Sequence, residues 1–310
     1  MAILKLIPTC KDYIWGGTKL RERYNKDFPG ERIAESWELS CHPDGPCRIA
    51  GGEADGMTLA DWIGQQGEDV LGTNCRDLAE FPVLVKFIDA KGDLSVQVHP
   101  DDETAMALEG QSGKTEMWYI LEADEDAFLY CGFSRDITPE EYRQHIADGT
   151  LTAVLRKRPV RKGDVIFIPA GTIHAICRGI VLAEVQQSSN VTYRVFDYNR
   201  PGADGKPRQL HVDKALRVTE LSSAIPSADT DGHLIRCRYF TVDAIVPGAA
   251  QCCDERSFVS LLITDGEGTV SCGSESVFCR RGDSLFLPAA SGTFMLSGSV
   301  EGLIIRAGAC

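Results

Sequence analysis

Short runs in which apolar and polar residues alternate dominate this chain, and such runs are typical of half-buried β-strands. LSVQVHP (94–100) alternates in this way, whereas FPVLVKFIDA (81–90) is a continuous apolar run suited to a buried strand. Further strand-like runs lie at 116–123, 127–133, 159–176, 180–187 and 192–198, and short runs between Gly-rich turns continue from 233 to the end. The pattern predicts a mainly β protein.

Four segments carry helix signals instead: 57–66, 102–110, 138–149 and 210–221. The third has the most complete start signal, because Thr138 can cap it, Pro139 takes its first position and Glu141 closes a capping box. Thr58 is suited to the same capping role in the first segment. We therefore expect a small helical portion beside the strands.

One stretch of the chain is repeated. GDVIFIPAGTIHAI (163–176) returns as GDSLFLPAASGTFM (282–295), with the same Gly-Asp, apolar alternation and Pro-Ala. The position that holds His174 in the first copy holds Thr293 in the second. Since the second copy keeps the frame without the histidine, a purely structural role for His174 is disfavoured.

The repeat and the even spacing of the short strands indicate two small β-barrels or sandwiches. SSAIPSADTDG (222–232) is the best candidate for a linker between them, because it is rich in turn residues. We therefore predict two domains, residues 1–225 and residues 226–310.

The 310 residues include 43% apolar and 25% charged residues and carry a formal net charge of −13. This charge argues against general binding to nucleic acid or acidic membranes, although it allows a small anionic substrate. No apolar run approaches the length of a membrane span, and the start lacks the pattern of a secretion signal. The 12 cysteines form no C-x-x-C pair, so we expect reduced, mostly buried thiols in a cytoplasmic protein.

Gln97 and His99 are two residues apart in a predicted strand and therefore lie on one face of it. A strand whose polar face meets water would give the same pattern. His174 ends an apolar strand, and Glu116 stands where another apolar strand begins. Two imidazoles, a carboxylate and an amide oxygen suit a divalent first-row metal, and Zn²⁺, Mn²⁺, Fe²⁺ and Co²⁺ all remain open on ligand chemistry.

Other charged residues have ordinary structural explanations when each is taken alone. Glu184 with the nearby Arg194 and Arg200 fits a surface salt-bridge network. Lys114 fits a solvated loop charge, and Glu35 fits a paired carboxylate in apolar surroundings. Trp15 is by default a core residue.

Several separated motifs, taken together, resemble the type I mannose-6-phosphate isomerases in their short bacterial form. These motifs are YIWGGTKL, AESWELSCHPDGP, VQVHPDDETA, GKTEMWYIL, IPAGTIHAI, EVQQSSNVTYRVFDYNR and LHVDKAL. The resemblance is dense from about residue 5 to residue 220 and general beyond. It implies a cupin fold with two jelly-roll β-barrels, the first metal-binding and catalytic and the second without a metal site.

The resemblance also implies roles for particular residues. Four are implied zinc ligands, for one ion per chain: Gln97, His99, Glu116 and His174. Three are implied catalytic residues: Arg194, Lys114 and Glu184. Three are implied substrate-binding residues: Trp15, Glu35 and, as the best candidate for the phosphate, Arg200.

The implied reaction interconverts D-mannose 6-phosphate and D-fructose 6-phosphate through a metal-stabilised cis-enediolate. The base is left open between Glu184, Lys114 and a water on the metal. The expected partner is a small sugar phosphate, and the sequence leaves the oligomeric state open, a monomer included. Two alternatives are a non-catalytic metal cupin that binds a sugar phosphate and an Fe²⁺-dependent cupin oxygenase.

Overall fold

The structure is a computed structural model that describes residues 3–202, 205–225 and 227–309. The described residues form two compact units. The first, called the terminal unit here, contains residues 3–11, 18–87 and 228–309. The second, called the central unit, contains residues 12–17 and the chain from 88 to 227.

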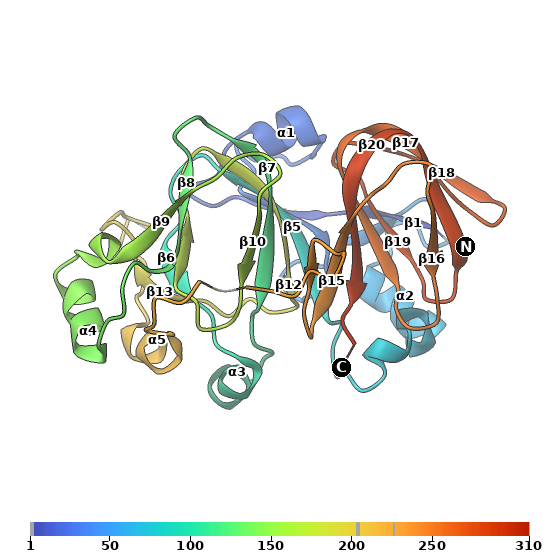
Figure 1. The fold of residues 1–310 in the computed structure, drawn as a ribbon. Helices are drawn as coiled ribbons and strands as arrows, with labels where there is room; N and C mark the ends of the chain where they lie inside the picture. The colour runs from blue at the N-terminus through green and yellow to red at the C-terminus, as the bar shows by residue number, and fades with distance from the viewer. Residues whose placement is uncertain (1–2, 203–204, 226, 310) are drawn as a thin grey trace. The chain divides into compact units, whose positions relative to one another are not determined.

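The terminal unit contains a nine-stranded sheet in the order β14-β15-β20-β17-β19-β1-β4, with β16 paired to β20 and β18 paired to β17 (Figure 1). The strands of this sheet are β1 (Leu4–Ile7), β4 (Arg48–Ala50), β14 (Ile235–Arg236), β15 (Phe240–Ala244), β16 (Ala250–Cys253), β17 (Val259–Cys272), β18 (Glu275–Arg280), β19 (Ser284–Leu287) and β20 (Gly292–Ala307). The unit also contains β2 (Thr9–Lys11), β3 (Glu35–Leu39), α1 (Lys19–Tyr24), α2 (Leu59–Gln66), η1 (Glu68–Leu71) and η2 (Thr73–Cys75).

The division of the chain differs from the predicted domains 1–225 and 226–310. The break after residue 227 falls inside the predicted linker 222–232, but most of the first 87 residues group with the C-terminal part. The reason is that β1 pairs antiparallel with β19 on one side and with β4 on the other. Pairing between strands so far apart in sequence leaves no local signal in the chain.

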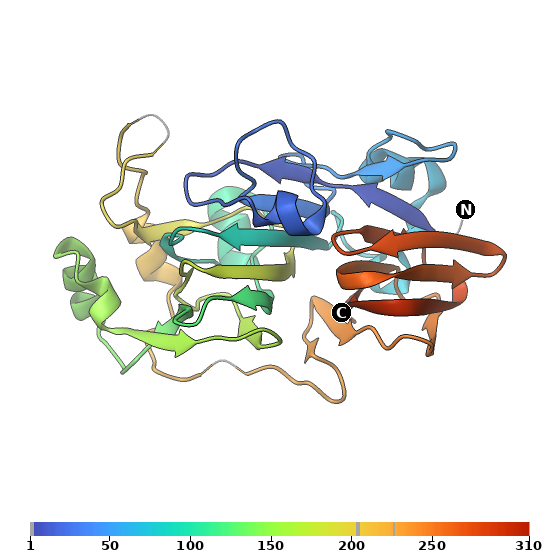
Figure 2. The same ribbon diagram turned by 90° about the horizontal axis from the view of Figure 1, so that it is seen from above.

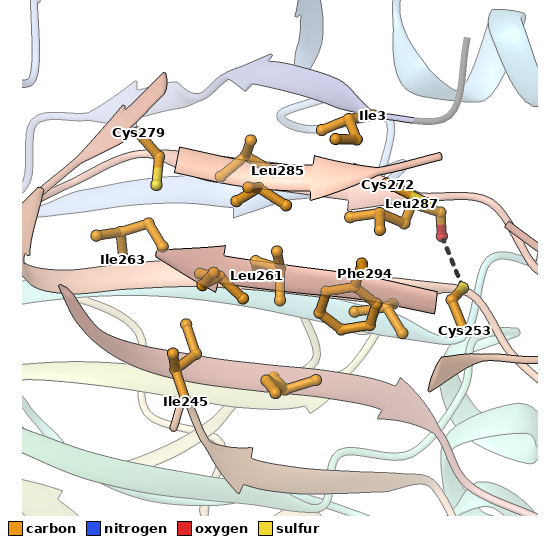
Figure 3. Packing of buried hydrophobic residues seen from close by; sticks show 14 of the residues in the cluster. Ile3, Ile245, Cys253, Leu261, Ile263, Cys272, Cys279, Leu285, Leu287 and Phe294 are labelled. Atoms are coloured by element: carbon orange, nitrogen blue, oxygen red, sulfur yellow. Dashed lines mark hydrogen bonds between the residues drawn. The ribbon is translucent and has the colours of Figure 1, made fainter. Parts of the chain in front are cut away.

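A hydrophobic cluster fills the terminal unit. Figure 3 shows Leu261, Leu285 and Phe294, from three different strands, pointing into one apolar layer. Each of these side chains is at most 1% exposed, and Ile3 from the N-terminal segment joins the same cluster. Burial of this apolar surface is the main favourable term that holds the unit together.

The central unit contains a five-stranded sheet in the order β13-β6-β11-β8-β9. These strands are β6 (Val96–Val98), β8 (Phe128–Phe133), β9 (Leu155–Pro159), β11 (His174–Ile176) and β13 (Tyr193–Phe196). A second set of antiparallel strands places β7 (Glu116–Ala123) between β10 (Val165–Ile168) and β12 (Ile180–Gln187). The boundary between the units falls within β5 (Val83–Ala90).

Helices α3 (Asp102–Glu109), α4 (Pro139–Ala147) and α5 (Val212–Val218) belong to the central unit, with the short η3 (Leu151–Ala153). Figures 1 and 2 show α4 in green and α5 in gold near each other at one end of this unit. The capping box of α4 is present, because Thr138 and Glu141 each bond to the other's backbone N–H. All four predicted helices are confirmed. The fifth, α1, was missed because it is short and Thr18 makes no side-chain cap.

The structure also explains the sequence repeat. Gly163 and Gly282 both adopt a φ of +91°, which favours glycine, and each opens the turn into a strand. In both turns the aspartate that follows accepts a hydrogen bond from the backbone N–H three residues before it, at 2.9 Å for Asp164 and for Asp283. The repeated sequence is therefore a repeated turn and strand, once in each unit.

The mainly β prediction is confirmed, with few helices. Within the part of the chain that the structure describes, no helix is long and apolar enough to cross a membrane. The described cysteines are free thiols, and most of them are buried, as expected.

Candidate metal centre

Three buried side chains of the central unit converge on one point. His99, Glu116 and His174 each offer a ligand atom, and these atoms lie within 4.8 Å of one another. Nε2 of His99 is 3.6 Å from Oε2 of Glu116, and Nε2 of His174 is 3.4 Å from Oε1 of the same carboxylate. All three side chains are at most 1% exposed. Residues that are up to 75 positions apart in sequence thus form one triad with the donor atoms of a metal site.

The hydrogen bonds of the two imidazoles set their tautomers. Nδ1 of His99 lies 2.8 Å from the carbonyl of Val191, and Nδ1 of His174 lies 2.9 Å from the carbonyl of Thr172. A carbonyl oxygen only accepts, so each Nδ1 carries a proton, and in the neutral ring the lone pair lies on Nε2, toward Glu116. Burial lowers the pKa of His174 to about 4, so this ring is neutral at neutral pH. The donor set therefore fits a divalent metal.

Gln97 belongs to a row of residues that face one another across the five-stranded sheet. It pairs with His174 of β11 on one side and with Arg194 of β13 on the other. Directly opposite residues of neighbouring strands project from the same face, so the amide, imidazole and guanidinium share one face. The Gln97 amide nitrogen is 3.4 Å from Nε2 of His174. Nε of Arg194 donates to the Ser95 hydroxyl at 3.2 Å.

Loop packing brings Lys114 and Glu116 to His99. The backbone N–H of Lys114 donates to the carbonyl of Pro100 at 3.0 Å, and Pro100 directly follows His99. Gly113 is needed there, because a Cβ at this residue would lie 2.5 Å from the backbone carbon of Asp101.

The side chain of Gln187 fixes the same loops from β12. Its carbonyl oxygen accepts from the backbone N–H of Thr115 at 2.8 Å, and its nitrogen donates to Asp102 at 2.8 Å. Sequence analysis missed this positioning role, because a Gln-Gln pair at a strand end carries no specific signal.

Lys114 and Glu184 lie beside the triad. The Lys114 ammonium is 2.7 Å from Oε2 of Glu116, 3.2 Å from Nε2 of His99 and 3.9 Å from Oε1 of Glu184. Glu184 is 3% exposed, and its other oxygen accepts a hydrogen bond from the indole N–H of Trp118 at 3.0 Å. Trp118 also packs edge-on against His174, with ring centroids 5.4 Å apart.

Trp118 is a second residue that sequence analysis missed. It stands two residues after Glu116 in β7, so the period of two in a strand already placed both side chains on one face. The two-residue spacing was therefore a usable signal, but an aromatic residue in an apolar strand is most often a core residue.

Three predicted substrate residues lie in different surroundings. Trp15 belongs to the central unit, is buried and packs on Tyr13 with ring centroids 5.6 Å apart. Arg200, in the same unit, donates to Asp197 at 2.8 and 3.0 Å. Glu35 belongs to the terminal unit, where it accepts a hydrogen bond from the Trp37 indole at 2.7 Å. Their roles toward a substrate stay predictions.

Comparison with known proteins identifies the family. The catalytic-domain model of type I phosphomannose isomerase matches residues 3–126, and the cupin-domain model of mannose-6-phosphate isomerase matches residues 230–307. A mannose-6-phosphate isomerase of Bacillus subtilis is 37% identical over 309 residues, which cover 96% of each chain. The chain belongs to the type I mannose-6-phosphate isomerases. Another member, from Streptococcus mutans, is 35% identical and is likewise covered over 96% of each chain.

Solved structures of mannose-6-phosphate isomerases share this fold. The crystal structure of a Bacillus subtilis mannose 6-phosphate isomerase matches with a TM-score of 0.91 and 32% identity, covering 98% of this chain and 99% of that one. A zinc-bound holo form of a mannose 6-phosphate isomerase matches with a TM-score of 0.78 at 18% identity, covering 99% and 100%. The predicted family and cupin fold are confirmed. Catalysis as an isomerase is supported, and the non-catalytic alternative is not.

Proposed function

We propose that this chain interconverts D-mannose 6-phosphate and D-fructose 6-phosphate with one zinc ion per chain. The proposed ligands are Gln97, His99, Glu116 and His174. The buried triad supports this proposal most strongly. Backbone carbonyls orient both imidazoles there, so that each Nε2 points to the Glu116 carboxylate. Oriented imidazoles of this kind are typical of metal sites.

An aldose–ketose interconversion moves a proton between C2 and C1 and passes through a cis-enediolate with negative charge on O1 and O2. A zinc ion bound at the triad supplies a Lewis acid for that charge. Arg194 stays protonated and so cannot act as the base, and we assign it to stabilise the same charge. Its place opposite Gln97, on the face that carries His174, supports this assignment.

Glu184 and Lys114 are the candidates for the group that carries the proton. The Trp118 indole holds one oxygen of Glu184, and Lys114 lies 3.9 Å from the other. The Lys114 side chain can therefore give a proton as an ammonium and take one back as the resulting amine, beside a fixed carboxylate and in a place from which water is largely excluded. These contacts support a paired role of the two residues in proton transfer.

Arg200 is the proposed partner of the substrate phosphate. Burial acts to raise the pKa of Asp197, but hydrogen bonds from Arg208 and Arg200 outweigh it and hold this pKa below its usual value. Asp197 is therefore ionised and positions both arginines, and with Arg194 nearby the cluster keeps a net positive charge. A guanidinium held in this way suits a phosphate oxygen. Trp15 and Glu35 are also proposed to contact the substrate, because the motifs in which they lie resemble those of the family.

A coupled assay tests the proposal. Mannose 6-phosphate and the purified chain are expected to give fructose 6-phosphate, and prolonged treatment with a chelator is expected to abolish the reaction until zinc is restored. Since the reaction consumes no oxygen, an oxygen electrode should show no uptake. Formation of fructose 6-phosphate at an undiminished rate in metal-free protein would refute the metal dependence, and oxygen uptake would favour the oxygenase alternative.

A further inference from the structure

A cavity of about 470 Å³ lies in the terminal unit and shares no residue with the metal centre. Its lining includes three arginines, Arg236, Arg256 and Arg306, against two aspartates, Asp243 and Asp254. Arg256 is paired with Asp254 and Arg306 with Asp243, so the excess positive charge of the lining lies on Arg236, although the chain as a whole has a net charge of −13. The volume falls within the range of small-molecule sites.

Strand register places two of these arginines in one row. Arg236 of β14 and Arg306 of β20 both lie directly opposite Thr241 of β15. All three therefore project from the same face of the sheet. Neighbouring strands are about 4.8 Å apart, so the two positive charges flank a single strand. Each guanidinium has an aspartate partner and keeps further N–H donors, so an anion bound between them would contact both groups.

The remaining contacts fix the side chain of Arg306 and leave most donors of Arg236 without a partner among the contacts described below. Asp243 lies two residues after Thr241 in the same strand. Its carboxylate accepts a hydrogen bond from Nη1 of Arg306 at 3.0 Å and contacts Nδ1 of His233 at 2.5 Å. Arg236, by contrast, has as its ionic partner among the described residues Asp231, at 3.8 Å, and the Asp231 side chain is 76% exposed. Most of the donors of Arg236 thus remain available to a ligand.

We propose that this cavity binds a small, hydroxylated phosphate ester, a function beyond the isomerase reaction. Guanidinium groups bind phosphate oxygens in paired hydrogen bonds, which the Arg236–Arg306 row provides. Neutral polar side chains in the lining, Asn74, Thr241 and Gln251, suit the hydroxyl groups of the ligand. None of the described lining residues is Phe, Tyr or Trp, which disfavours a nucleotide because a base needs a stacking surface.

Cys252 offers a local readout for this cavity. It lines the cavity, its carbonyl accepts from Arg306 at 3.3 Å, and it is the exposed thiol among the described cysteines. The test measures alkylation of Cys252 by iodoacetamide in the zinc-loaded full chain, with peptide mapping. The probes are glycerol 3-phosphate, inorganic phosphate and citrate.

We expect glycerol 3-phosphate to slow the alkylation of Cys252 in the unchanged chain. Because hydrogen bonds to charged groups contribute about 1.5–3 kcal/mol, Arg306→Met and Arg236→Met should each require about 10- to 100-fold more ligand. Arg236→Met serves if Arg306→Met fails to fold, since Arg236 is exposed. Arg281→Met is the matched control, because Arg281 is also paired with an aspartate in this unit but lies outside the cavity.

Several outcomes would overturn the proposal. If millimolar glycerol 3-phosphate did not slow the alkylation of Cys252, the proposed site would be wrong. The same conclusion would follow if all variants were protected equally. Protection by citrate or inorganic phosphate as strong as that by the ester would contradict the ligand class. Isomerase turnover should be unchanged in both cavity variants, so this test can fail or succeed independently of the proposed reaction.

Discussion

Replacing Arg194 by alanine is expected to lower turnover about 10²–10³-fold, the usual cost of losing one group that stabilises charge in a transition state. The zinc content should stay at the value of the unchanged chain. Arg194 bonds to the Ser95 hydroxyl and to the carbonyl of Gln209, so its loss leaves the oriented imidazoles of the triad in place. Steady-state kinetics and metal analysis on the same preparation check both parts.

Arg178→Ala is the matched control for this experiment. Arg178 also belongs to the central unit, but its side chain is exposed and it follows a different strand. It should retain full turnover. Unchanged turnover in Arg194→Ala would remove Arg194 from the reaction, and loss of zinc in that variant would show that it supports the metal site instead.

Replacing His174 by alanine is expected to abolish both metal binding and activity while the fold is retained. The imidazole is one of the three buried side chains proposed as ligands, and a triad that loses one nitrogen donor holds a divalent ion far more weakly. Metal analysis, turnover and circular dichroism would be measured together. His174→Leu keeps more of the buried volume without offering a ligand atom, and it guards against a variant that fails to fold.

The sequence repeat supplies the control for His174. Thr293 occupies the equivalent position in the second copy, at the start of β20, and its side chain is exposed. Thr293→Ala should therefore leave metal content and turnover unchanged. If folded His174→Ala bound zinc as the unchanged chain does, the ligand assignment would be wrong.

Local pattern predicted much of the central unit. The period of two predicted that Gln97, in β6, and His99, just after β6, lie on one face. Thr138 and Glu141 likewise predicted the capping box of α4. The spacing of His99, Glu116 and His174 along the chain did not predict that they converge. That prediction followed from resemblance, because distant strands come together only in the folded chain.

Other features depend on contacts that no local pattern encodes. The pairing of β1 with β19 joins residues 4–6 to residues 284–286 and so moves the N-terminal segment into the terminal unit. The bond from Trp118 to Glu184 and the bonds of Gln187 are likewise made between strands or loops. The row of Arg236, Thr241 and Arg306 appears only once the strand register is known.

The most direct test of the metal-dependent isomerase is a zinc titration of metal-free protein, followed by the rate of fructose 6-phosphate formation from mannose 6-phosphate. With the triad as the only zinc site used in turnover, the rate should rise linearly and reach its plateau at one equivalent of zinc per chain. In His174→Ala the rate should stay near zero throughout the titration. A full rate before any zinc is added, or an equal response in His174→Ala, would contradict this account.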